Sequence, residues 1–215
     1  MALALAIILP DVFAAEHEQA QRLQNSFSWE ATPRLSFKGG VQFRFREHLQ
    51  DFYYFKWEAE SALEVTDWFE LPASFRRVKR ELETGWEQFE LLLLDPKIRI
   101  FSSAGWQLDL RTRFQFLLDN PAGLQFVRVQ PKLWYTFMLR RHELGWFIYN
   151  DFYFPVEEAI RENDSRFNIF STGLRWPLNP HTELNLYYML FSMRLQRDLP
   201  WRHIHQSCLA VGFYL

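Results

Sequence analysis

The sequence predicts an all-β protein: a single antiparallel up-and-down transmembrane β-barrel of about ten strands, or twelve if one segment is split. Charged and aromatic residues alternate along FRFREHLQDFYYFKWEAESALE at 43–64, which is the two-residue period of a strand. Similar segments of ~10 to 14 residues follow one another from Thr32 onward, with turn residues between them. Aromatic residues make up 18% of the chain, yet its mean hydropathy is negative.

Ten segments carry this alternation. They span residues 34–46, 51–64, 67–78, 86–100, 105–117, 123–138, 142–154, 165–176, 181–195 and 202–214. Residues 25–31 are a further candidate, but counting them gives eleven, and a bacterial barrel with both ends in the periplasm needs an even number. A split at Pro96 is the route to twelve strands. We therefore predict ten.

The alternation does not by itself say which face is inside. In a membrane barrel the aromatic face meets lipid and the charged face lines the lumen. A soluble, lipocalin-like barrel has the reverse arrangement and must fit its aromatic rings into a small lumen. Phe occurs on strand after strand, 22 times in all, so the membrane barrel is the better fit.

The N-terminus predicts export. Residues 1–15 resemble a signal peptide, with an apolar stretch and small residues at the expected cleavage site, although its usual positive charge is absent, as if the true start lay upstream. Residues 16–32 are expected to form a periplasmic arm or a plug, and residues 33–215 the barrel. The predicted location is the outer membrane of a diderm bacterium.

Tryptophans are expected at both membrane interfaces, where amphipathic rings form girdles. Those near short connectors are Trp68, Trp106, Trp146 and Trp176, and those near the opposite strand ends are Trp86 and Trp201.

A polar network is expected in the lumen. The predicted lumen-facing residues are Arg44, Arg46, Lys56, Glu58, Glu60, Glu70, Asp109, Arg111, Arg113, Arg128, Lys132, Glu183 and Asn185. Buried charges are costly unless they are paired, so these side chains should pair across strands and largely fill a narrow barrel. Three interpretations stay open: a structurally plugged barrel, a narrow passage of low specificity, or a lumen that binds small polar solutes.

An enzymatic alternative is an outer-rim hydrolase of protease or lipase type. Its candidate residues are Asp151, His203 and His205, with Glu157 and Glu158 in the neighbouring connector. His203 and His205 share one face of a strand and, with one carboxylate, form a candidate metal site. No nucleophile or phosphate-loop motif is present, so we predict no catalytic residue, metal or cofactor. A structural or envelope-interaction barrel is the third alternative.

The expected partners are those of the cell envelope. The basic stretch RRVKRELETG at 76–85 is a candidate contact for lipopolysaccharide phosphates, besides membrane lipid itself. The final strand, QSCLAVGFYL, resembles the signal that the barrel-assembly machinery reads. The net charge of −2 gives no basic excess for nucleic acid.

The order of several short motifs resembles an uncharacterised bacterial outer-membrane barrel family, domain of unknown function 2490. The motifs are FRFREHLQDFYYFKWEAESALEVTDWFELPASFRR, WQLDLRTRFQF, YNDFYF and LNLYYML. The resemblance covers residues 34 to 215. It implies an outer-membrane barrel and brings no activity, substrate or catalytic residue.

Overall fold

The computed structural model describes residues 18–46, 51–82, 85–118, 123–140, 142–156, 166–194 and 200–215. These residues form strands and short connections. The described part of the chain contains no apolar helix of membrane-spanning length. The signal peptide predicted at 1–15 lies outside the described residues.

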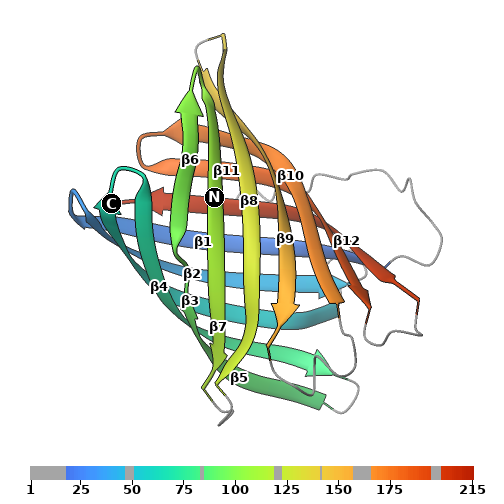
Figure 1. Cartoon of the computed structure of the whole chain (residues 1–215). Coiled ribbons are helices and arrows are strands. Elements are labelled where there is room, and N and C mark those ends of the chain that lie inside the picture. The colour runs from blue at the N-terminus through green and yellow to red at the C-terminus, as the bar shows by residue number, and fades with distance from the viewer. Residues whose placement is uncertain are drawn as a thin grey trace.

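Twelve strands form one sheet that closes into a barrel (Figure 1). They are β1 (Glu18–Thr32), β2 (Leu35–Arg46), β3 (Asp51–Thr66), β4 (Phe69–Leu82), β5 (Gly85–Leu94), β6 (Lys97–Ser103), β7 (Trp106–Leu117), β8 (Leu124–Leu139), β9 (His142–Pro155), β10 (Arg166–Asn179), β11 (Thr182–Arg194) and β12 (Arg202–Tyr214). Apart from β5 and β6, consecutive strands pair antiparallel, and a parallel pairing of β1 with β12 closes the ring. The predicted all-β, up-and-down barrel is confirmed.

β5 and β6 lie end to end in one position of the ring, between β4 and β7. Ala73 on β4 pairs with Leu94 at the end of β5. Glu70 on β4 pairs with Lys97 at the start of β6, so the register continues across the break without a shift. Pro96 lies in the break and has no N–H to give to the ladder. Splitting the segment there gives twelve strands but eleven positions in the ring.

Residues 18–32 correct the predicted strand count. We expected residues 16–32 to form an arm or a plug, but residues 18–32 are β1, held between β2 and β12. The parallel closure places Ser28 beside Tyr214, so β1 and β12 run in the same direction. The described chain therefore enters the barrel at one end and leaves it at the other. A barrel needs an even number of strands only when the first and last strands have their free ends on the same side of the membrane. The argument for ten strands therefore does not apply.

The two ends of the barrel differ in their connections. The connections at 33–34, 67–68, 104–105, 140–141 and 180–181 lie at one end of the barrel, which we call the turn end, and each of them spans two residues. The connections at the loop end span 47–50, 83–84, 118–123, 156–165 and 195–201. Short and longer connections take turns as the spacing predicted, except at 83–84, where the expected longer connection spans only two residues because β4 continues to Leu82.

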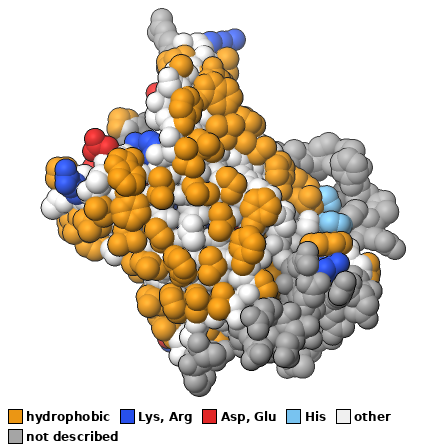
Figure 2. Space-filling model, in the orientation of Figure 1, with side chains coloured by type: hydrophobic (Ala, Val, Ile, Leu, Met, Phe, Trp, Pro, Cys, Tyr) orange, Lys and Arg blue, Asp and Glu red, His pale blue; other side chains and the backbone are white. Residues whose placement is uncertain are grey.

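Polar side chains face the lumen and large apolar side chains face outward. The buried polar residues are Gln42, Lys56, Ser74, Asp95, Asp109, Arg113, Gln130, Asp151, Ser171, Glu183 and Gln206. The exposed apolar residues include Leu23, Phe27, Phe37, Leu63, Leu92, Ile100, Phe152 and Leu174. Apolar side chains cover the part of the wall seen in Figure 2. This is the reverse of a lipocalin-like barrel, so that alternative is not supported.

Candidate functional site

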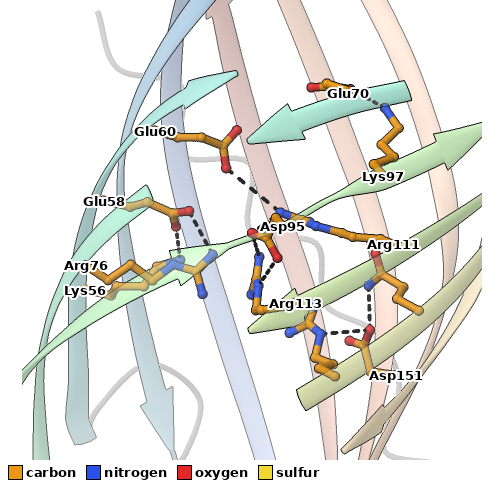
Figure 3. A network of polar contacts seen from close by, with 12 residues as sticks. Lys56, Glu58, Glu60, Glu70, Arg76, Asp95, Lys97, Arg111, Arg113 and Asp151 are labelled. Atoms are coloured by element: carbon orange, nitrogen blue, oxygen red, sulfur yellow. Dashed lines mark hydrogen bonds and ion pairs between the residues drawn. The ribbon is translucent and has the colours of Figure 1, made fainter. Parts of the chain in front are cut away.

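All thirteen predicted lumen residues lie on the inward face of their strands. Side chains alternate between the two faces of a strand, so residues separated by an even number of positions share a face. Each predicted residue is itself buried or is separated by an even number of positions from a buried residue of the same strand. Gln42 marks this face on β2, and Ser74 and Gln130 mark it on β4 and β8. The charges form a network of polar contacts along this face, mostly between neighbouring strands (Figure 3).

Asp95 forms the centre of this network and has no exposed surface. Arg113, from β7, donates to both of its carboxylate oxygens, from Nε at 2.6 Å and from Nη2 at 2.8 Å. Arg111 Nη2 donates to Asp95 Oδ2 at 2.6 Å. Glu60 on β3 lies 3.9 Å from the same Arg111 nitrogen. One carboxylate therefore fixes two guanidinium groups at the break between β5 and β6.

Two further carboxylates extend the network to both sides. Glu58 on β3 accepts from Lys56 Nζ at 2.7 Å and from Arg76 Nη2 at 2.8 Å. On the other side, Asp151 on β9 accepts from Gln130 Nε2 at 2.6 Å, and Arg128 Nε lies 3.1 Å from it. These contacts tie β3 to β4 and β8 to β9.

We call these residues the ion-pair layer. Its members are Lys56, Glu58, Glu60, Arg76, Asp95, Arg111, Arg113, Arg128 and Asp151. Next to it, the side chains of Gln42, Leu93 and Ser171 are at most 1% exposed. A lumen wide enough for water at this level would leave these side chains accessible. Packing thus keeps solvent from these three side chains, while Arg111 and Glu60 within the layer are 25% and 19% exposed.

The rest of the lumen holds its cations against aromatic rings. Arg44 lies over the ring of Tyr54, 4.1 Å from its centroid, and Arg22 lies 5.8 Å from the ring of Tyr187. Lys132 lies 3.7 Å from the ring of Trp134. We call these three cations and their rings the aromatic sector. Among the described residues these cations have no ion-pair partner, so the lumen carries an excess of positive charge.

Sequence reasoning missed Asp95 and placed Arg76 in a connector. Asp95 follows the apolar run at 91–94, which hides the alternation. Asp95 lies two residues after Leu93 and therefore on the same face of the strand. This spacing could have identified Asp95 as an inward-facing residue. Arg76 falls within the predicted strand 67–78, but it was assigned to the basic stretch at 76–85, which was taken as a connector although β4 continues to Leu82.

The lumen opens into a cavity of about 330 Å³ at the turn end. Its lining comprises the β6–β7 turn at 102–106 together with Lys97, Gln107, Asp109, Trp134, Thr136 and Arg175. The turn is tightly built, because Ala104 and Gly105 both have positive φ, as a two-residue hairpin turn requires. A Cβ on Gly105 would lie 2.6 Å from the carbonyl oxygen of Thr136, so only glycine fits there.

The candidate hydrolase residues do not come together. Asp151 faces the lumen and is 2% exposed. His203 and His205 have the opposite parity to the buried Gln206, so they point outward, where His205 contacts Tyr188 and His203 Nδ1 lies 3.0 Å from Ser192 Oγ. The barrel wall separates the two sets. Glu157 and Glu158 lie outside the described residues, and within the described ranges no three His, Cys, Asp or Glu side chains form a metal-binding group.

Five of the six girdle tryptophans are exposed. They are Trp68, Trp86, Trp106, Trp176 and Trp201, at 38–58%. Trp146 is half-buried and donates to Thr172 Oγ1 at 3.1 Å. Trp29 near the turn end, 52% exposed, was missed because residues 16–32 were set aside as an arm.

The basic stretch at 76–85 belongs largely to strands, because β4 ends at Leu82 and β5 begins at Gly85. Its cations divide between the two faces. Arg76 joins the ion-pair layer, while Arg77 points outward with Glu90 and Lys79 lies over the ring of Trp86.

Comparison with known families gives one match. The family described as "Protein of unknown function (DUF2490)" matches residues 23–196. No curated protein matches the chain.

Proposed function

This chain belongs to that family of unknown function, and we propose that it is an outer-membrane β-barrel whose lumen is closed by the ion-pair layer. One observation carries the proposal: Asp95, with no exposed surface, is held by Arg111 and Arg113 of the neighbouring strand β7, and the same Arg111 reaches toward Glu60 on β3, a strand that does not pair with β7. Buried ion pairs of this kind fix strand register, and breaking them leaves a charge without a partner. The barrel serves as a closed envelope element with open space toward its turn end.

The outer surface supports the membrane location. Exposed apolar side chains lie around the wall, and exposed tryptophans lie near both strand ends, as interfacial girdles do. A ring of paired strands leaves no sheet edge to meet lipid. The outer membrane is favoured because barrels are the spanning structures of that membrane.

Outward cations near the loop end support a contact with lipid phosphates. Arg77 and Lys79 lie on the outer face of β4, beside the exposed Trp86. Arginine pairs with phosphate bidentately. These outward strand residues, and not a loop, are therefore the proposed contact for lipopolysaccharide phosphates.

Spin labelling tests the membrane location. Phe43→Cys in a Cys208→Ala background puts a nitroxide on the outer face of β2, and Ser102→Cys puts one at an exposed position near the end of β6, beside the β6–β7 turn. In vesicles, dissolved oxygen should increase the relaxation rate of the label at 43, and a water-soluble nickel chelate should not. The chelate should increase the relaxation rate of the label at 102. Collision of the chelate with the label at 43 would refute the lipid-facing wall.

Chloride flux tests the closure. Vesicles carrying the refolded wild type should leak chloride no faster than empty vesicles. The double variant Arg111→Ser/Arg113→Ser removes both guanidinium groups from Asp95 and should raise the flux. Rapid flux through the wild type would identify a passage in place of a closed barrel.

A further inference from the structure

The turn-end cavity is separate from the ion-pair layer and faces the open end of the lumen. Asp109, 4% exposed, lies in its lining, and the layer begins with Arg111 on the same face of β7. The layer therefore borders the cavity on its inner side.

Every charged side chain that lines the cavity already has a partner within the protein. The pairs are Lys97 with Glu70 at 2.8 Å, Arg175 with Glu183 at 2.5 Å, and Asp109 with Gln107 at 2.8 Å. The stem of Arg175 crosses Gly145, where an added Cβ would lie 3.3 Å from the Cβ of Arg175. These charges are therefore held in place before any solute arrives.

The charge pattern selects against ions. An anion that approaches Lys97 and Arg175 also meets Asp109, and a cation that approaches Asp109 meets both cations. Either ion would exchange its hydration for a site that holds fixed charges of both signs. A neutral solute with several hydroxyl groups can accept from the cations and donate to the carboxylate without carrying a charge into the site.

The remaining lining fits the same class of solute. Ser102, Ser103 and Thr136 supply hydroxyl groups, and the indole of Trp134 supplies an apolar surface. Trp134 is itself held by Phe147, at a centroid distance of 5.2 Å, and by Lys132. A sugar ring has an apolar C–H face and a polar rim, which match an aromatic surface bordered by hydrogen-bonding groups.

We propose that the turn-end cavity is a binding site for a small neutral sugar, with Trp134 as the stacking surface and Gln107, Asp109 and Thr136 as hydrogen-bonding groups. This proposal is independent of the proposed closure of the lumen. A titration measures sugar binding at the turn end, and its result is the same whether or not a solute can pass the ion-pair layer.

Calorimetric titration of the full chain tests the proposal. The protein is refolded in lauryldimethylamine oxide, which has no sugar headgroup, and titrated with glucose, sucrose, trehalose, sodium sulfate and choline chloride. At least one sugar should bind saturably in the millimolar range, and the two salts should not. Trp134→Ala should weaken sugar binding by about tenfold or more. Trp176→Ala, on the outer face and 42% exposed, is the matched control and should bind as the wild type does.

Thr136→Val provides a second variant that keeps the side-chain shape, in case Trp134→Ala does not fold, and it should also weaken sugar binding. Folding of each variant is checked by its heat-dependent shift in gel mobility. Absence of saturable sugar binding by the wild type, preference for sulfate or choline, or equal binding by the folded cavity variants would overturn the assignment.

Discussion

The lumen stabilises its cations in two different ways. In the ion-pair layer, Arg113 meets a fully buried carboxylate through two hydrogen bonds. In the aromatic sector, Arg44 rests on the ring of Tyr54, with no ion-pair partner among the described residues. A carboxylate compensates a buried cation much more strongly than a ring quadrupole does. The layer should therefore hold the barrel together and set its register, while the aromatic sector fills space and leaves positive potential.

The largest effect should come from Arg113→Ala. It leaves Asp95 buried with one guanidinium partner fewer, and should lower the free energy of unfolding by ~3 kcal/mol or more. Urea unfolding of the refolded barrel, followed by tryptophan fluorescence, measures this. The double variant Asp95→Ala/Arg113→Ala should cost less than the sum of the two single variants. An unchanged unfolding midpoint for Arg113→Ala would show that the layer does not stabilise the fold.

Arg44→Ala is the matched change in the aromatic sector. It removes a cation–ring contact and some packing, but it also removes a buried charge without a carboxylate, so the net loss should be about 1 kcal/mol. The same urea titration applies. A loss as large as that of Arg113→Ala would erase the distinction between the two regions.

The smallest effect should come from an exposed pair near the loop end. Arg80 and Glu87 lie 2.7 Å apart, but their side chains are 46% and 43% exposed. Solvent screens such a pair, so Arg80→Ala should change the free energy of unfolding by less than ~1 kcal/mol. Arg80→Ala is the control for Arg113→Ala and Arg44→Ala. If it lowered the free energy of unfolding as much as Arg113→Ala does, burial would not explain the different contributions of these cations to stability.

The comparison also explains what the sequence could predict. Alternation is a local property, so strands such as β3 and β7, and the inward face of each, follow from residue spacing alone. Which charges meet depends on register, and register depends on bulges such as the one between Arg44 and Phe45 in the β2–β3 pairing. Asp95 was hidden by an apolar run, and β1 was set aside because an even number of strands was assumed. Asp151 and His203 were grouped for a similar reason, because sequence distance does not show that they lie on opposite faces of the wall.

Single-channel recording of the refolded wild-type barrel in a planar lipid bilayer tests the central claim most directly. The closed ion-pair layer predicts a silent bilayer when folded protein is demonstrably inserted, and anion-selective steps after Arg111→Ser/Arg113→Ser, because Arg22, Arg44 and Lys132 leave positive charge in the lumen. Steady, salt-dependent steps from the wild type would contradict the account and make the lumenal charges the selectivity residues of an open passage.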